Sequence, residues 1–208
     1  MQRSMCVYIV DDDLAVRDSI ALWLGLRGHQ TRSFESAEAF LDEVQPDLQG
    51  CALIDLQLGG MNGLALQRRL ALVGVSLPII FVTAHGDVAT ARAALKAGAF
   101  DFIEKPIDFD ELGTLVAAAL AANADHASRA QRFRELHHRL SRLTQREREV
   151  MDLVVRGMHN REIAARLGIS ARTVEVYKAR LMDKLDVRRV PDLVRLAMSD
   201  HEGLPLLP

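Results

Sequence analysis

The sequence predicts an α/β domain with a doubly wound, five-stranded parallel sheet, joined by a long linker helix to an all-α, four-helix domain. Short apolar runs alternate with amphipathic helical patterns over the first 120 residues, and the pattern is entirely helical after residue 140. A chain of 208 residues is long enough for two domains of unequal size. We place the α/β domain at 1–120, the linker helix at 121–140 and the four-helix domain at 141–208.

The α/β domain follows from the order of its apolar segments. Apolar runs that lie between helices are typical of strands buried on both faces, which occur in parallel sheets with helices on each side. The expected strands cover residues 6–10, 29–34, 51–55, 79–83 and 99–103. The expected helices between them cover residues 14–27, 36–45, 63–73 and 87–97.

A long helix is expected from Asp108 to about residue 140. Asp108 is suited to cap its first turn, and Glu111 three residues later completes the pattern of a capping box. The segment continues through alanine-rich and charged residues without a proline, which favours one uninterrupted helix.

Short helices with short connections fill the rest of the chain. Asn160 and Ser170 are suited to cap two successive helices, and Gly168 lies in the turn between them. Two capped helices joined by a short turn with a glycine are typical of a helix-turn-helix, in which the second helix enters the major groove of DNA. A final helix is expected over about 191–199. On the helix pattern alone, a plain helical bundle is the alternative.

Composition and charge narrow the class of protein. Apolar residues make up 49% and charged residues 26% of the chain, as in ordinary globular proteins. The apolar stretches are too short to span a membrane, and the N-terminus has no signal-peptide layout, so we expect a cytoplasmic protein with no membrane partner. Two cysteines provide neither a disulfide framework nor metal-ligand spacing.

Charge is divided unevenly along the chain. The first 120 residues hold 9 basic and 16 acidic side chains, whereas residues 121–208 hold 17 and 12. The N-terminal half is therefore acidic and the C-terminal half basic. A basic C-terminal half is suited to bind a polyanion such as DNA.

Polar side chains gather where the expected strands end. Asp11 and Asp12 follow the first strand, Asp55 ends the third, Thr83 ends the fourth, and Lys105 follows the fifth. Functional residues of doubly wound sheets lie beyond these carboxyl ends.

Two carboxylates about 6 Å apart repel by roughly 3 kcal/mol at an effective dielectric of 20. A Mg²⁺ ion relieves that repulsion, because it binds a few carboxylates and keeps several waters.

The same set of side chains suits phosphoryl transfer to a carboxylate. Asp55 would be the nucleophile and Mg²⁺ would neutralise the phosphate oxygens. Lys105 and the hydroxyl of Thr83 would hold the remaining oxygens.

Residues 5–120 resemble the receiver domain of two-component response regulators. The motifs that carry the resemblance are IVDDD, ALIDLQLGGMNGLAL, FVTAHGD and KAGAFDFIEKP. The resemblance implies a flavodoxin-like sheet of strand order 2-1-3-4-5 and phosphorylation of Asp55 by a sensor histidine kinase. It also implies a cis Lys105-Pro106 peptide and a conformational switch made by Thr83 and Phe102. The implied Mg²⁺ ligands are Asp11, Asp12, Asp55 and the backbone carbonyl of Gln57, with Asp13 adjacent.

One segment departs from the family pattern. Relatives commonly read Asp-x-x-Met-Pro, beginning at the phosphoacceptor, but this chain has Leu58 and Gly59 in place of Met-Pro. Glycine permits backbone conformations that proline forbids. We therefore expect a more mobile loop, with weaker binding of phosphate or Mg²⁺.

The second helix of the helix-turn-helix carries the expected DNA contacts. Arg172, Lys178 and nearby hydroxyls suit phosphate groups, whose contacts give salt-sensitive affinity. Glu175 is suited to accept from a cytosine amino group, and Val176 to touch a thymine methyl. The complete set of expected contacts is Ser170, Arg172, Thr173, Glu175, Val176, Tyr177, Lys178 and Ala179.

The segment from LTQREREV to YKARLMDKL resembles the four-helix LuxR/NarL/FixJ DNA-binding family, and its pairing with this receiver is similar to the FixJ subgroup. The resemblance implies that Glu175, Val176 and Ala179 face the groove. It also implies a dimer contact by the last helix, whose apolar spacing equally suits packing on its own domain. The residues of that contact are Val190, Leu193, Val194 and Ala197.

Together these features predict a transcriptional regulator and not an enzyme. Phosphorylation would promote a homodimer that binds promoter DNA, with RNA polymerase as a further partner. An aspartyl-phosphate phosphatase with a DNA-binding appendage is one alternative, but it needs an aspartate two residues after the nucleophile, where Gln57 stands. A phosphorylation-independent DNA-binding protein is the other, and the intact acidic set with Thr83 and Lys105 argues against it.

Overall fold

The structure is a computed structural model that describes residues 5–45, 48–83 and 88–201, apart from the side chains of 88–91 and 199–201. The chain divides into two compact units, Met1–Ala127 and Ser128–Pro208. Within the described ranges, every helix is too short or too polar to cross a membrane.

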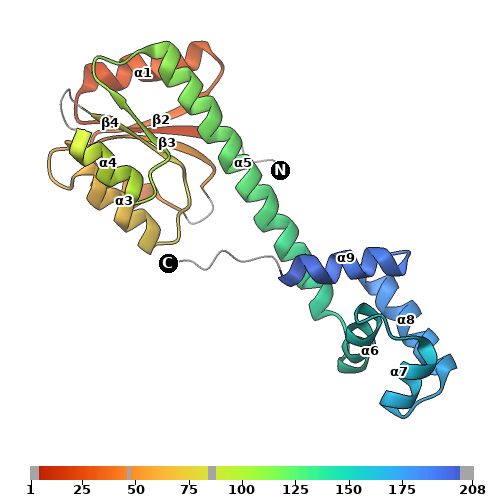
Figure 1. The fold of residues 1–208 in the computed structure, drawn as a ribbon. Coiled ribbons are helices and arrows are strands. Elements are labelled where there is room, and N and C mark those ends of the chain that lie inside the picture. Colours follow the sequence, from red (N-terminus) through yellow and green to blue (C-terminus); the bar gives the residue numbers. More distant parts are fainter. Residues whose placement is uncertain (1–4, 46–47, 84–87, 202–208) are drawn as a thin grey trace. The chain divides into compact units, whose positions relative to one another are not determined.

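The first unit contains a five-stranded parallel sheet in the order β2-β1-β3-β4-β5, which confirms the predicted fold class (Figure 1). Its fifth strand begins two residues later than predicted. The reason is that the backbone N–H of Ala99 still bonds to the carbonyl of Ala94, and this closes the preceding helix. The strands are β1 (Cys6–Val10), β2 (Gln30–Phe34), β3 (Gly50–Asp55), β4 (Ile79–Thr83) and β5 (Asp101–Glu104).

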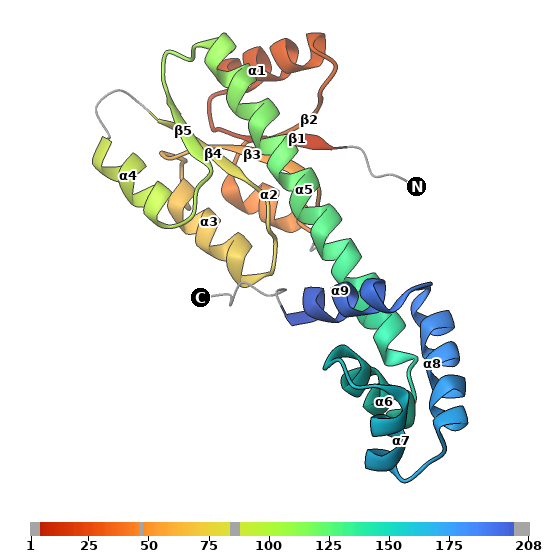
Figure 2. The same cartoon turned by 45° about the vertical axis from the view of Figure 1, so that its right-hand side comes forward.

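Helices cover both faces of this sheet, as expected for parallel strands (Figure 2). The helices are α1 (Leu14–Leu26), α2 (Ala37–Glu43), α3 (Gly63–Leu72), α4 (Val88–Lys96) and α5 (Phe109–Ser141). One apolar core lies between the sheet and α2, α3 and α4, and a second lies between the sheet, α1 and the start of α5. Residue 87, where the fourth helix was predicted to begin, lies outside the described residues, as do positions 84–86 of the FVTAHGD motif.

The long helix α5 begins as predicted and is anchored to the sheet. Asp108 Oδ1 accepts from the N–H groups of Asp110 at 2.9 Å and Glu111 at 3.2 Å. Further along, the buried Asn123 accepts from Gly50 N at 2.9 Å and donates to the carbonyl of Ser76 at 3.2 Å. The packing of the first unit therefore continues past residue 120.

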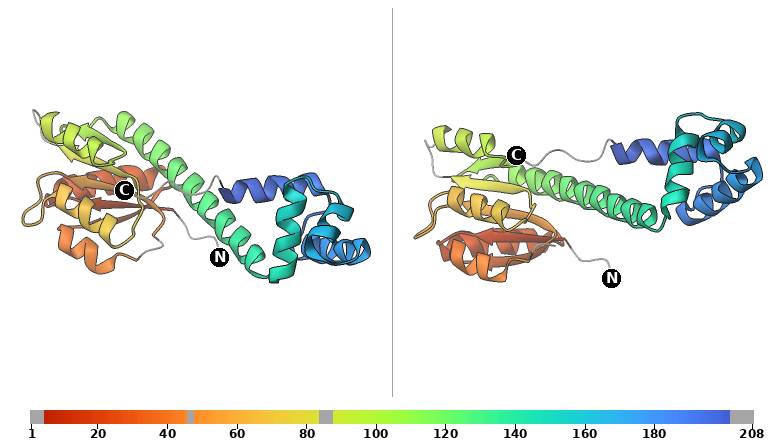
Figure 3. Two further views of the ribbon diagram at one scale, coloured as in Figure 1. Left: turned by 60° about the horizontal axis from the view of Figure 1, so that its bottom comes forward. Right: turned by 90° about the horizontal axis from the view of Figure 1, so that it is seen from below.

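The second unit adds a bundle of four helices after the end of α5, at the blue end of the chain (Figure 3). They are α6 (Gln145–Val155), α7 (Asn160–Leu167), α8 (Ala171–Leu185) and α9 (Val190–His201). Buried side chains from every one of these helices form one core, with Val150, Ile163, Val174, Leu181, Leu185 and Leu193 among them.

A partly buried ion pair joins α6 to α8. The carboxylate of Glu147 accepts from the N–H of Thr144 at 2.8 Å, which completes a capping box, and from Lys184 Nζ at 2.6 Å. Burial alone would raise the pKa of Glu147, but the contacts with Lys184 and Thr144 outweigh it and hold the pKa below its ordinary value. The pair fixes the end of α8 against the start of the bundle.

One predicted cap is wrong by a residue. The cap of α7 is His159, whose N–H donates to Glu162 at 2.7 Å, so Asn160 is the first helical residue. Because Asn160 is not the cap, its side-chain oxygen accepts a hydrogen bond from Lys178 Nζ of α8 instead, at 3.2 Å.

Candidate functional site

Three aspartates converge at the carboxyl edge of the sheet. Val10 of β1 pairs with Ile54 of β3, so Asp11 and Asp55, the residues that follow, lie beside each other. Both are buried, with exposed fractions of 1% and 6%, while Asp12 is exposed. One carboxylate oxygen from each of the three lies within 4.8 Å of those of the other two.

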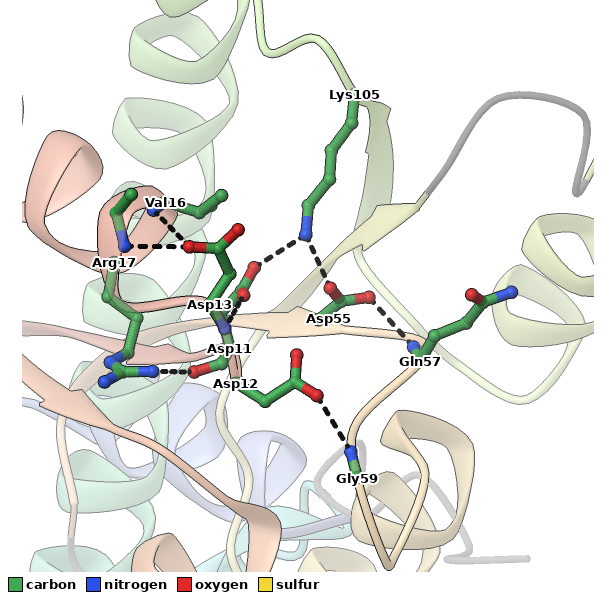
Figure 4. A network of polar contacts seen from close by, with 10 residues as sticks. Asp11, Asp12, Asp13, Val16, Arg17, Asp55, Gln57, Gly59 and Lys105 are labelled. Carbon is green, nitrogen blue, oxygen red and sulfur yellow. Dashed lines mark hydrogen bonds and ion pairs between the residues drawn. The ribbon is translucent and has the colours of Figure 1, made fainter.

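Lys105 joins the two buried aspartates. Its Nζ lies 2.9 Å from Asp11 Oδ2 and 2.6 Å from Asp55 Oδ2 (Figure 4). The Lys105-Pro106 peptide is cis, as the family resemblance implied. The backbone N–H of Lys105 donates to the carbonyl of Thr83 at 2.8 Å, which ties the residue to the end of β4.

Two side chains of this cluster have shifted pKa values. Burial raises the pKa of Asp11 by more than the hydrogen bonds from Lys105 and from the Asp13 amide lower it. Burial alone would lower the pKa of Lys105, but its contacts with Asp55 and Asp11 outweigh burial and raise the pKa above the ordinary value. The lysine is therefore held in its charged form between two carboxylates.

Backbone N–H groups fix the orientation of the carboxylates. One N–H donates to each of them, and these pairs are Asp13 N to Asp11 Oδ1 at 2.9 Å, Gln57 N to Asp55 Oδ1 at 2.8 Å, and Gly59 N to Asp12 Oδ2 at 3.2 Å. Such bonds stabilise the ionised form of a carboxyl group. The turn that carries the first two aspartates and the loop after β3 are thus attached to the same site.

Arg17 is a member of this site that the sequence did not reveal. Its guanidinium is buried under the β1–α1 turn and donates to the backbone carbonyl of Asp11 at 2.5 Å (Figure 4). The available signal was its position on α1, because Arg17, Ile20 and Leu24 share the buried face of that helix. A charged residue on an apolar face indicates a buried polar partner.

The donor set fits a hard divalent cation. Carboxylate oxygens that lie close together are the ligands preferred by Mg²⁺, which also retains water at an exposed site. Asp11, Asp12 and Asp55 would hold it, and the backbone carbonyl of Gln57 as a fourth ligand remains a prediction. Thr83 is buried at the same edge, one residue after Val82, which pairs with Asp55.

Phe102 lies on β5, opposite Phe81 of β4. Its ring is partly buried and packs against the core between the sheet and α2, α3 and α4. The structure thus places Phe102 on a strand next to that of Thr83, and the switch itself remains a prediction.

The expected DNA contacts divide into two groups. Arg172, Glu175, Val176 and Ala179 are exposed and share one face of α8, at the spacing of successive helical turns. Among the others, Ser170 caps α8 through the N–H of Thr173, at 3.1 Å. Tyr177 packs against the core of the bundle, and Lys178 is bound to Asn160.

Arg180, four residues after Val176, is exposed as well and was missing from the expected contacts. On α9, Leu193 is fully buried in the core of its own unit, while Val190, Val194 and Ala197 are partly buried.

Two family models match the chain. Residues 7–117 match the response regulator receiver domain, and residues 141–197 match the luxR family of bacterial regulatory proteins. The chain therefore belongs to the response regulators of two-component systems that carry a LuxR-type DNA-binding domain. Within that class it is similar to transcriptional regulatory proteins of the FixJ type.

Similar proteins and structures match nearly the whole chain. FixJ of Azorhizobium caulinodans is 41% identical over 198 residues, covering 95% of this chain and 94% of that protein. TdiR of Thauera aromatica is 40% identical over 197 residues, covering 94% and 87%. The structure of the response regulator StyR has a TM-score of 0.90 at 36% identity and covers 94% of this chain and 99% of its own. Full-length FixJ from B. japonicum has a TM-score of 0.59 at 36% identity, covering 96% and 98%.

Proposed function

We propose that this regulator is switched by phosphorylation. A sensor histidine kinase would transfer a phosphoryl group to Asp55 in a Mg²⁺-dependent reaction, and the phosphorylated chain would form a homodimer that binds promoter DNA. The observation that carries the proposal is the position of Asp55, 2.6 Å from a lysine and within one cluster with Asp11 and Asp12. The proposed modules are a receiver at 1–120, a linker helix at 121–140 and a DNA-binding domain at 141–208, and such a regulator would act in the cytoplasm.

The residues present account for the transfer. An oxygen of Asp55 would form the new bond to phosphorus while the bond from phosphorus to the donor histidine nitrogen breaks. Lys105 already contacts the acceptor carboxylate and would bind the oxygens of the arriving group. The second oxygen of Asp55 is held by Gln57 N, which limits rotation of the nucleophile. A bound Mg²⁺ would neutralise charge on the phosphoryl oxygens.

A conformational signal would follow from the new charge. The phosphoryl group would draw the hydroxyl of Thr83 toward it, and Phe102 would turn inward into the space left behind. The surface formed by α4, β5 and the start of α5 would then favour pairing with a second copy. This is a local electrostatic change that biases a surface with two arrangements.

Incubation of the full-length protein with Mg²⁺ and a small acyl phosphate tests the proposal. We expect a mass gain of one phosphoryl group, located on the peptide that contains Asp55, together with an increase in the dimer fraction on size-exclusion chromatography. Omission of Mg²⁺ should prevent the gain. A gain on any other peptide, or no gain at all, would contradict the proposed mechanism.

On the DNA-binding side, two substitutions on the exposed face of α8 should have different consequences. Arg172→Ala should weaken binding to all sequences and reduce the slope of log affinity against log salt by about 1, because a phosphate contact is lost. Glu175→Ala should instead reduce discrimination at one base pair by about 1–3 kcal/mol. Titrations of operator and unrelated DNA at several salt concentrations measure both effects.

Arg129→Ala is the matched control, since it removes the same charge from an exposed position on α5. It should leave the salt slope unchanged. An equal change in slope for Arg129→Ala and Arg172→Ala would show that the effect comes from net charge, and it would contradict a phosphate contact by α8.

A further inference from the structure

The loop after β3, residues 56–62, is held by carboxylates from three different elements. Alternate residues of the loop direct their N–H groups to acceptors at the end of β3, in the β1–α1 turn and on α2. The pairs are Gln57 N to Asp55 Oδ1 at 2.8 Å, Gly59 N to Asp12 Oδ2 at 3.2 Å and Met61 N to Glu38 Oε1 at 3.2 Å.

Gly59 is the donor whose residue type matters most. It stands where the resemblance to receiver domains implies a proline, and proline has no backbone N–H to donate. Its acceptor, Asp12, is the exposed member of the acidic cluster, so burial does not fix the orientation of that carboxylate. Figure 4 shows one oxygen of Asp12 directed at Gly59 and the other at the side of the site where Asp55 lies.

We propose that Gly59 is a positioning residue for the metal ligand Asp12. Its N–H holds one oxygen of the carboxylate, and this directs the other oxygen toward the space shared with Asp11 and Asp55. A cation bound among the three aspartates needs that orientation. Hydrogen bonds to metal ligands commonly contribute about 10- to 100-fold in metal affinity.

This inference rests on the proposed Mg²⁺ site and opposes one expectation drawn from the sequence. Glycine at position 59 suggested a more mobile loop and weaker Mg²⁺ binding. The hydrogen bond to Asp12 argues that glycine instead supports Mg²⁺ binding, through a donor that proline lacks.

Gly59→Ala and Gly59→Pro form a matched pair of variants. Alanine keeps the N–H, and its Cβ would lie 3.6 Å from Asp12 Oδ2, which is an ordinary contact. Proline removes the N–H. In calorimetric titrations of the full-length protein with Mg²⁺, the alanine variant should keep the wild-type dissociation constant, and the proline variant should bind about 10-fold more weakly.

Proline can also alter the loop itself, so the Gly59→Pro change is repeated in an Asp12→Ala background. If Gly59 acts through Asp12, proline should cause no further loss of Mg²⁺ affinity there. Equal losses in both backgrounds, or equal affinities for the alanine and proline variants, would overturn the proposal. If the wild-type protein bound no Mg²⁺, the proposed metal site would fail as well.

Amide exchange without Mg²⁺ gives an independent readout. The Gly59 N–H should exchange with solvent faster in Asp12→Ala than in the wild type, because its acceptor is gone. The Gln57 N–H, which is bound to Asp55, should keep its wild-type rate. An unchanged rate at Gly59 would show that Asp12 does not hold this amide and would overturn the inference.

Discussion

Asp55→Asn is expected to abolish the uptake of a phosphoryl group from a small acyl phosphate. An amide has nearly the shape of a carboxylate but lacks the charged oxygen that attacks phosphorus. Asparagine retains an oxygen that can accept from the N–H of Gln57, so the loop after β3 should keep its position. Intact-protein mass spectrometry in the presence of Mg²⁺ and the phosphodonor should show a mass gain for the wild type and none for this variant.

Asp13→Asn is the control for this experiment, because it makes the same chemical change two residues after Asp11. Asp13 is exposed and caps α1 through the N–H of Ala15 at 2.8 Å, and asparagine serves equally well as a cap. This variant should take up the phosphoryl group as the wild type does. Uptake by Asp55→Asn, or its loss in Asp13→Asn, would show that the acceptor has been misassigned.

The fold and the acidic cluster were both predictable, for the same reason. Each strand of the first unit is a short apolar run, and Asp11, Asp55 and Thr83 stand where such runs end. In a parallel sheet, the carboxyl ends of the strands share one edge. Local pattern therefore placed residues that are 28 or more positions apart along the sequence at one site, once the sheet topology was known.

Contacts that depend on side chains from neighbouring elements were not predictable. Helical periodicity placed Lys178 near the exposed face of α8, but its Nζ contacts Asn160 on α7. The buried position of Arg17 likewise depends on the backbone carbonyl of Asp11, which no periodicity reveals. Periodicity determines which face of a helix is buried, whereas the partner of a polar group depends on tertiary packing.

The loop after β3 shows the same limit. The sequence has Gly59 where the resemblance to receiver domains implies a proline, and the expected consequence was a more mobile loop. The N–H that glycine provides has its acceptor in Asp12, 47 residues earlier. The residue type at position 59 indicated that the backbone is conformationally free there. The hydrogen-bond partner of its N–H, Asp12, could be identified only from the structure.

Lys105→Met is expected to lower the free energy of unfolding of the first unit by about 2 kcal/mol at neutral pH. Methionine keeps much of the side-chain length but removes the charge, so Asp11 and Asp55 would remain close together in a buried site without the lysine. Urea unfolding followed by the fluorescence of Trp23 measures the effect. Trp23 is the single tryptophan of the chain, and it packs against Phe109 within the same unit.

The pH dependence separates this ion pair from a general packing effect. The pKa of Lys105 is raised from 10.5, so its stabilisation is fully present below that value and is lost as the pH rises through the raised pKa. The difference in stability between the wild type and Lys105→Met should therefore shrink in alkaline solution. Saturating Mg²⁺ should also reduce this difference in stability at neutral pH, because the cation stabilises the folded state of the variant by supplying positive charge.

Lys96→Met is the control. It removes an exposed lysine of α4 and should change stability by less than about 0.5 kcal/mol. A comparable loss in both variants, or a difference that stays constant with pH and Mg²⁺, would mean that Lys105 stabilises the unit by packing and not by its charge.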